Sequence, residues 1–260
     1  MVASPATQTS GPPAGVEDTT KGRTLLAGIA LLAVSALGAL VFIQGFQVLQ
    51  TALGFESFAL TFLVGGGLAT LWLGLVGIAY LRVRPVDVSY ALRWPTLRDA
   101  AWILGGVILS VVVAVLVEAV VIPFGDGGAT TISAAASVSN PLVIYSIFFV
   151  GNLIFIAPIE EFFFRGVIQG RLRESFGAVA AIAITSIGFA LGHIPSYWFG
   201  GSDLVSVSVV GALVGIAAGG FVLGAIYERT ESLLIVSIIH GLLNSIGIGL
   251  ALVVTLRARR

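Results

Sequence analysis

Seven long apolar segments divide the chain, and their length decides what it can fold into. They cover residues 24–50, 57–81, 101–125, 141–170, 176–192, 204–227 and 232–256. A helix needs about 20 mostly apolar residues to cross the hydrocarbon core of a bilayer, and only 176–192 is at the short limit. Charged residues make up 10% of the chain, too few to cover a water-facing surface. The sequence therefore predicts an all-α fold, a polytopic transmembrane helical bundle of seven or eight helices.

Basic residues in the connecting loops indicate the orientation of the bundle. Lys21 and Arg23 precede the first segment. Cytoplasmic loops carry an excess of Lys and Arg, so we expect a protein of the cell membrane with a cytoplasmic N-terminus. Loops with and without basic residues then alternate through six crossings. A seventh crossing would place Arg257, Arg259 and Arg260 outside, which leaves the choice between seven and eight helices open.

Composition also excludes several kinds of site and partner. The chain has no cysteine, so disulfides, thiolate nucleophiles and cysteine-ligated metals are excluded. Its formal net charge is zero, which provides no field that would attract a polyanion. We therefore expect no nucleic-acid partner, and we expect the protein to be embedded in the lipid bilayer.

Three ionisable residues lie well inside the apolar segments, namely Glu160, Glu161 and His240, and His193 directly follows the segment 176–192. An ionisable group at the centre of a bilayer costs at least about 2.5–3.5 kcal/mol on insertion scales, so its presence indicates function. The two histidines are the only ones in the chain. This concentration of titratable groups predicts a polar site within the membrane.

Local spacing indicates how these residues are arranged. Glu161 and Arg165 are four residues apart with the acid first, the favourable order for an ion pair on one helix. That pairing would leave Glu160 as the freer carboxylate. Pro158 removes a backbone donor two residues before Glu160, so we expect a bend and an unpaired carbonyl there. Pro195 is expected to end the fifth helix.

Three short motifs follow one another on separate apolar segments. They are EExxxR at 160–165, FxxxH at 189–193 and HxxxN at 240–244. Together they resemble the motifs of the CPBP intramembrane proteases, a family that includes the type II CAAX prenyl endopeptidases and the Abi-type bacteriocin-processing and immunity proteins. The resemblance covers roughly residues 141–250. It implies a four-helix catalytic core that hydrolyses a peptide bond in a membrane-associated or secreted peptide.

The resemblance also implies roles for individual residues. A protease inside a bilayer needs a base that activates water and donors that stabilise the tetrahedral oxyanion. Glu160 would activate the water, with His193 helping to hold it. His240 and Asn244 would aim donors at the oxyanion. Glu161 would be counted with these catalytic residues and would assist them together with Arg165. The supporting residues would be Arg165 and Phe189, and we expect Phe189 to be a packing wall beside His193.

The sequence leaves open whether a metal takes part. Two histidines and a glutamate are a ligand set that zinc uses in peptidases, so a bound divalent metal such as zinc would be held by Glu160, His193 and His240. The HExxH arrangement of many zinc peptidases is absent. A glutamate-and-water mechanism needs the same residues without a metal, and we favour that alternative.

These features divide the chain into four parts. Residues 1–23 are expected to form a disordered polar tail, 24–140 accessory transmembrane helices, 141–256 the protease core and 257–260 a basic tail. Glycines at helical spacing in 204–227 predict close helix packing, and Asn152 is expected to bond to a neighbouring helix or to lipid headgroups.

Two other functions compete with proteolysis. The first is a non-catalytic membrane scaffold or immunity protein, which would tolerate the loss of Glu160. The second is a proton-coupled transporter, since Glu and His inside a bundle can relay protons. The sequence shows no internal repeat of the kind that many transporters carry, which disfavours the second alternative.

Overall fold

The chain is a bundle of long helices. The computed structural model describes residues 14–55, 57, 60–86, 95–125 and 141–258, and within these ranges it contains helices and turns without any strand. Among the described residues, seven helical stretches are long and apolar enough to cross a membrane. They run over Thr20–Ala52, Leu63–Val83, Leu97–Phe124, Leu142–Arg173, Ala178–Phe199, Val207–Thr230 and Leu233–Val254. The expected all-α transmembrane bundle is confirmed.

The first three crossings are simple helices. They are α1 (Ala14–Ala52), α3 (Gly66–Val83), which follows the short π-helical segment η1 (Thr61–Gly65), and α4 (Leu97–Val121), which ends in the 3-10 turn η2 (Ile122–Phe124). Helix α4 begins with a capping box, in which Thr96 Oγ1 accepts the Asp99 amide at 3.3 Å and the Asp99 carboxylate accepts the Thr96 amide at 2.7 Å. Such reciprocal bonds satisfy amides that the first helical turn leaves unpaired.

Helices extend into both segments that the sequence predicted as tails. Helix α1 begins at Ala14, so residues 14–23 are helical, and 1–13 lie outside the described residues. Pro13 is the last proline before residue 85, so nothing stops the first transmembrane helix from continuing into these polar residues. At the other end, α11 extends to Ala258 with Arg257 in its last turn, where a cation suits the negative end of the helix dipole.

The fourth crossing is a single helical rod whose hydrogen-bond pattern changes along its length. It consists of α5 (Pro141–Gly151), the π-helical segment η4 (Asn152–Ile156), α6 (Ala157–Glu161), the π-helical segment η5 (Phe162–Gln169) and α7 (Gly170–Arg173). We call this rod the fourth helix. Short π-helical segments within α-helices are rare and frequently occur at functional sites.

The remaining helices complete the bundle. Helix α8 (Ala178–Leu191) is followed by α9 (Ile194–Phe199), then by α10 (Val207–Thr230) and α11 (Leu233–Ala258). Pro195 lies in the first turn of α9, where proline is well tolerated, and α8 has already ended at Leu191. Two residues join α10 to α11, and the first of them, Glu231, has a left-handed backbone with φ 49°.

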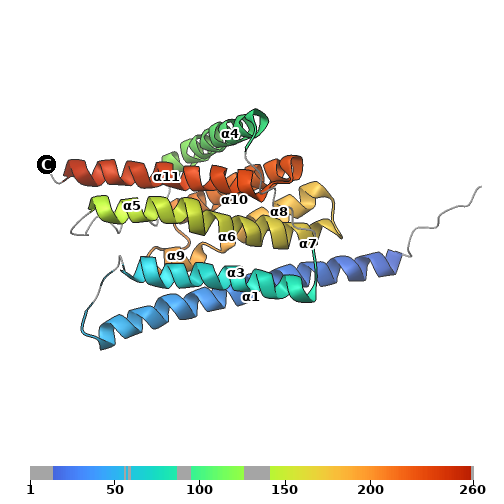
Figure 1. Ribbon diagram of the computed structural model, residues 1–260, viewed down its shortest axis with the longest axis horizontal. Coiled ribbons are helices and arrows are strands. Elements are labelled where there is room, and N and C mark those ends of the chain that lie inside the picture. The colour runs from blue at the N-terminus through green and yellow to red at the C-terminus, as the bar shows by residue number, and fades with distance from the viewer. Residues whose placement is uncertain (1–13, 56, 58–59, 87–94, 126–140, 259–260) are drawn as a thin grey trace, which may run out of the picture.

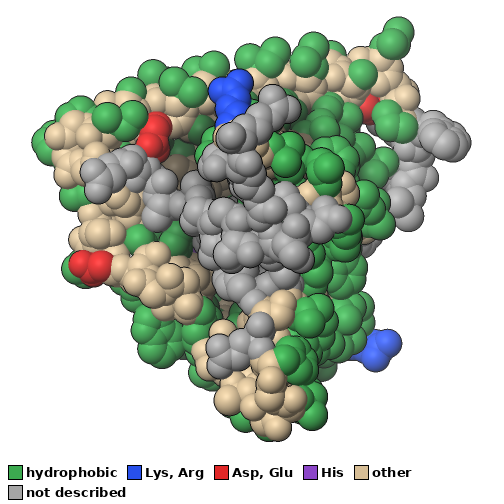
Figure 2. Space-filling view, turned by 90° about the vertical axis from the view of Figure 1, so that its left-hand side faces the viewer, with side chains coloured by type: hydrophobic (Ala, Val, Ile, Leu, Met, Phe, Trp, Pro, Cys, Tyr) green, Lys and Arg blue, Asp and Glu red, His purple; other side chains and the backbone are tan. Residues whose placement is uncertain are grey.

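The fourth helix lies at the centre of this arrangement. In Figure 1 it runs between α11 on one side and the pair α1 and α3 on the other. Its side chains Phe163 and Val167 are fully buried and belong to the main hydrophobic cluster, together with Val236 and Ile239 of α11. The flanks visible in Figure 2 carry mostly hydrophobic side chains, as expected where a surface contacts lipid rather than water.

Glycines on α10 permit the close helix packing that their spacing predicts. A Cβ at Gly211 would lie 2.6 Å from Cγ1 of Val121 on α4, and one at Gly224 would lie 2.9 Å from Cγ2 of Ile182 on α8. Real side chains do not approach so closely, so these contacts require glycine. Helix α10 is thereby held against α4 and α8, and it presents its backbone to the fourth helix.

Candidate active site

The backbone around the two adjacent glutamates departs from regular α-helix on both sides. In η4 the Ala157 amide donates to the Asn152 carbonyl, five residues earlier, and Pro158 follows in the first turn of α6. The disturbance expected at Pro158 thus takes the form of a wide π turn, because a proline cannot supply the backbone donor of a regular turn. Segment η5 begins directly after Glu161.

Glu161 is, together with Arg165, the most enclosed of the predicted site residues. Its side chain and that of Arg165 are fully buried, and Arg165 Nη1 lies 3.0 Å from Glu161 Oε1. The predicted ion pair is confirmed. The same oxygen also lies 2.7 Å from Nδ1 of His240 on α11. Glu161 therefore connects the fourth helix to α11, a contact that the spacing of its own helix did not reveal.

Arg165 is held from three directions. Besides Glu161, its Nη2 donates to the carbonyl of Gly220 on α10 at 3.1 Å. Its guanidinium carbon lies 4.7 Å from the centre of the Phe189 ring, within the range of a cation–π contact. A Cβ at Gly220 would lie 3.4 Å from Nη2 and 3.3 Å from Phe189 Cδ1. The glycine thus lets the guanidinium reach a backbone carbonyl of α10.

A second polar side chain of the fourth helix repeats this contact one turn later. Gln169 donates through Nε2 to the carbonyl of Gly224 at 3.2 Å and to the Glu228 carboxylate at 3.1 Å. Glu228 also accepts from Arg173 Nε at 3.0 Å. Arg165 and Gln169 thereby fix the register of the fourth helix against α10. None of the three motifs includes Gln169, although its position as a polar amide inside the apolar segment 141–170 could have indicated such a contact.

Glu160 is placed differently from its neighbour. Its side chain is 21% exposed, and its Oε2 lies 3.6 Å from Nε2 of His240, beyond the length of a direct hydrogen bond. Among the ion pairs of the described residues, Glu160 takes part in this contact with His240 alone. It is the freer of the two carboxylates, as the spacing of Glu161 and Arg165 predicted.

The two histidines lie on different helical segments that pack near the fourth helix: His240 is on α11, and His193 lies between α8 and α9. His193 occupies the position before the first residue of α9, and its Nδ1 lies 2.9 Å from the carbonyl of Phe189. A carbonyl only accepts, so Nδ1 carries the proton and Nε2 is left for another partner. Phe189 packs edge-on against both imidazoles, with ring centres 4.9 Å from His193 and 5.5 Å from His240.

Asn244 lies one turn beyond His240 on α11 and bonds to a residue that no motif contains. Its Nδ2 donates to Oδ1 of Asn152 at 2.7 Å. The expectation that Asn152 bonds to a neighbouring helix is confirmed, and the partner is a predicted site residue. The structure thus bonds Glu161 to His240 and places Glu160 3.6 Å from the same ring. Asn244 and His193 are attached to this region through Asn152 and Phe189.

The donors fit a three-ligand metal site poorly. Glu160 Oε2 and His240 Nε2 are close enough to share one ion. However, within the described ranges no three His, Asp or Glu side chains gather around one point. Zinc in proteins usually takes three or four protein ligands. We therefore derive no catalytic step through a metal.

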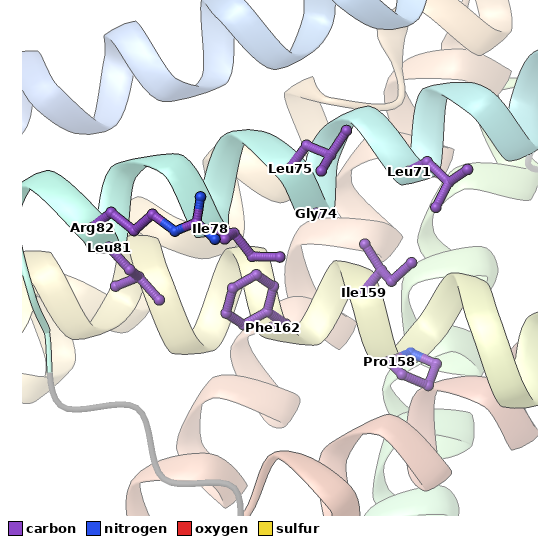
Figure 3. Close-up of a pocket in the computed structure, with 9 residues that line it drawn as sticks. All are labelled: Leu71, Gly74, Leu75, Ile78, Leu81, Arg82, Pro158, Ile159 and Phe162. Carbon is purple, nitrogen blue, oxygen red and sulfur yellow. The ribbon is translucent and has the colours of Figure 1, made fainter.

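A separate groove lies on another face of the fourth helix. It has a volume of about 640 Å³ and opens between α3 and the fourth helix (Figure 3). Pro158, Ile159 and Phe162 line one side, and Arg82 is the charged residue among its lining. Neither glutamate belongs to that lining, so this apolar groove is distinct from the polar cluster.

Comparison with known proteins finds a family similarity over the part of the chain that contains this cluster. Residues 142–246 match the family model described as type II CAAX prenyl endopeptidase Rce1-like. Searches of curated proteins and of solved structures gave no match. The matched segment contains the fourth helix from Leu142 onward and all three motifs. Over this segment, which is less than half of the chain, the protein is similar to the Rce1-like type II CAAX prenyl endopeptidases.

Proposed function

We propose that this chain is an intramembrane endopeptidase in which Glu160 activates a water molecule to cleave a membrane-associated or secreted peptide. The observation that carries the proposal is the chain of contacts from Arg165 through Glu161 to His240, which ends opposite Glu160. Three of these side chains are buried. Ionisable groups buried inside a membrane are costly and usually mark a functional site, which supports the proposal.

Glu161 sets the state of His240. A carboxylate that is paired with Arg165 accepts a hydrogen bond, so Nδ1 of His240 is the donor. The ring then presents Nε2 toward Glu160. A carboxylate behind a histidine fixes its tautomer and stabilises the positive charge that the ring acquires when its second nitrogen is also protonated. Glu161 and Arg165 thus have supporting roles, in agreement with the roles that the resemblance implies.

Glu160 is the group that we assign as general base. Its partial exposure gives a water molecule access, and one water can contact both Glu160 Oε2 and His240 Nε2, which are 3.6 Å apart. Glu160 takes a proton from this water, and the resulting hydroxide adds to the carbonyl carbon of the peptide bond. The proton then passes from Glu160 to the amide nitrogen, and the carbon–nitrogen bond breaks.

The remaining site residues stabilise the intermediate. His240 Nε2 and the second amide proton of Asn244 are the donors that we assign to the oxyanion, since an amide NH₂ has two protons and one is bound to Asn152. We assign His193 to holding the water through Nε2. Phe189 separates the two imidazole rings and supports both.

The test is quantitative identification of new protein termini in membrane and secreted fractions. Host cells that lack this chain are complemented with the wild type, with Glu160→Gln or with Glu174→Gln, at equal expression. Glu174 is the matched control because it carries the same charge just after the fourth helix, where it is paired with Arg171. We expect new termini with the wild type and with Glu174→Gln, and none with Glu160→Gln.

Each other outcome supports a different function. Termini that persist with Glu160→Gln contradict the assigned base. Identical termini in all strains favour the scaffold or immunity function, and proton flux into vesicles without peptide favours transport. Cleavage that is lost on chelation and restored by zinc supports the alternative in which Glu160, His193 and His240 hold a metal.

We also propose residence in the cell membrane with a cytoplasmic N-terminus. The proposal is supported by Lys21 and Arg23 before the first crossing, since basic residues are retained on the cytoplasmic side. A reporter fused to the N-terminus, which is active only in the cytoplasm, tests the orientation. An inactive reporter would reverse it.

A further inference from the structure

Asn152 is a buried polar residue in the fourth helix that lies outside the three motifs. It is 8% exposed and begins the π-helical segment η4. Its side chain bonds to Asn244, a residue 92 positions away in the chain. Side chains that bond across helices in a membrane contribute little to stability on average, about 0.6 kcal/mol. The pairing therefore calls for a reason other than holding the bundle together.

The backbone around Asn152 fixes where its side chain stands. The Asn152 carbonyl accepts the Ala157 amide across the π turn, directly before Pro158. On the facing helix, a Cβ at Gly241 would lie 3.2 Å from the Cα of Leu153 and 3.6 Å from the Asn152 carbonyl oxygen. Helix α11 and η4 thus touch backbone to backbone at this point. The separation of the two asparagine side chains is set by that contact rather than by their own flexibility.

The direction of the amide pair matters for chemistry. Asn244 Nδ2 donates and Asn152 Oδ1 accepts, at 2.7 Å. Bound in this way, the Asn244 amide cannot rotate freely about its last torsion, and its second N–H projects in a fixed direction. A preorganised donor stabilises a developing oxyanion better than a mobile one, because no reorganisation is needed during the reaction.

We infer that Asn152 is a positioning residue, which holds the Asn244 amide as an oriented donor for peptide hydrolysis. This inference rests on the proposed function, and it adds a residue that acts through Asn244 rather than on the substrate. It requires Asn152 to be an acceptor. Aspartate at 152 retains that property, whereas leucine has a similar volume and removes it.

The amide pair can be tested without any assay of cleavage. The chain contains three asparagines, Asn140, Asn152 and Asn244, so selective ¹⁵N-asparagine labelling gives three side-chain amide groups in the NMR spectrum of the protein in micelles. We expect Asn152→Leu to shift the Asn244 signals and to speed the exchange of its bonded proton with water. We expect Asn152→Asp to leave the Asn244 signals close to their wild-type positions.

The positioning role is tested on a peptide that spans a cleavage site found from the new termini. We expect Asn152→Leu to lower kcat about 10–100-fold with KM unchanged, since small misplacements of catalytic groups cost up to about 10²-fold, and Asn152→Asp to restore most of the rate. In an Asn244→Ala background, Asn152→Leu should cause no further loss. Asn152→Ala serves the same purpose if the leucine variant does not fold.

The matched control is a buried amide away from the site. Gln50 on α1 is 2% exposed, donates to Thr61 Oγ1 at 2.6 Å and accepts the Ser57 amide through Oε1 at 3.0 Å. Gln50→Leu removes both bonds, a larger loss of side-chain hydrogen bonding than the bond to Asn244 that Asn152→Leu removes, and we still expect kcat to be unchanged. Equal losses of kcat in both variants, or additive losses in the Asn244→Ala background, would show that Asn152 acts only on general stability.

The outcomes separate this inference from the proposed function. Unchanged Asn244 signals in Asn152→Leu overturn the inference whatever the enzyme does. Shifted Asn244 signals with an unchanged kcat would show that the bond exists but does not position Asn244 for catalysis, which also overturns the inference. If the wild type cleaves no peptide, the proposed hydrolysis fails and the role of Asn152 in it fails too, while the NMR spectra still decide whether the amide pair exists.

Discussion

The helices before residue 126 and those after residue 140 differ in what they bury. In α4, 6% of the most apolar stretch is buried, whereas the corresponding value in α11 is 50%. Both helices are strongly apolar, so hydrophobicity alone does not bring a residue inside. The fully buried ion pair between Glu161 and Arg165 lies in the later helices, and His240 is buried beside it. In a bilayer, lipid accommodates apolar side chains, so contacts between helices depend mainly on polar groups and on close packing.

The largest expected effect comes from breaking the buried ion pair. Arg165→Met leaves Glu161 without its guanidinium partner in a dry environment, and removing one member of a buried pair costs about 3–5 kcal/mol. The measurement is chemical unfolding in detergent micelles. The control is Arg84→Met in the exposed segment after α3, for which we expect a change within about 0.5 kcal/mol. Equal effects would remove the distinction between the two regions.

Truncation of apolar side chains should give the next largest difference. Ile239→Ala removes a fully buried side chain from α11, and such a cavity costs about 2–5 kcal/mol. Leu104 on α4 is 64% exposed and leaves no cavity, so Leu104→Ala should cost well under 1 kcal/mol. Thermal unfolding of both variants checks the comparison, and a larger loss at Leu104 would contradict it.

Two glycine substitutions should change the free energy of unfolding in opposite directions. A Cβ at Gly224 would lie 2.9 Å from Gln169 Oε1 and from Ile182 Cγ2, so Gly224→Ala should destabilise by about 1–3 kcal/mol through overpacking. A Cβ at Gly105 on α4 would meet no atom within 4 Å. Gly105→Ala should stabilise by up to about 1 kcal/mol, since alanine favours helix. Unfolding midpoints that shift in the same direction would count against the packing described for α10.

The smallest effect tests a contact that joins the two regions. Thr24 Oγ1 of α1 lies 2.8 Å from Ser175 Oγ, directly after the fourth helix. Thr24→Val keeps the shape and removes the bond, which should cost about 0.6 kcal/mol. A double-mutant cycle with Ser175→Ala measures the coupling, and a coupling energy near zero would mean that this contact does not hold the regions together.

Parts of this organisation could be predicted from local sequence alone. The apolar crossings follow from hydropathy, because each is a continuous apolar run, although the sequence left the choice between seven and eight open. The pair of Glu161 and Arg165 follows from a spacing of four residues on one helix. The glycines of α10 indicated close packing, although not that the carbonyls of Gly220 and Gly224 would accept bonds from the fourth helix.

Contacts between distant helices could not be predicted in the same way. The resemblance implied that His240 is an oxyanion donor, but its bond to Glu161 depends on how α11 packs against the fourth helix. The pairing of Asn152 with Asn244 depends on the close approach at Gly241. The π-helical segments arise where Pro158 and helix packing together select bonds across five residues, and no single residue specifies that choice. The start of α1 was missed because polar composition was interpreted as disorder.

The ion pair of the fourth helix also bears on how the protein is made. Glu161 bonds to His240, which is 79 residues later in the chain, and synthesis of that length takes about 4–16 s at about 5–20 residues per second. During that interval the fourth helix must enter the bilayer without its partners from α10 and α11. Arg165, four residues away on the same helix, is already present and neutralises Glu161. The pair thus makes the segment competent for insertion before the site exists, and we expect a chain with Glu161→Gln to insert less efficiently at the translocon.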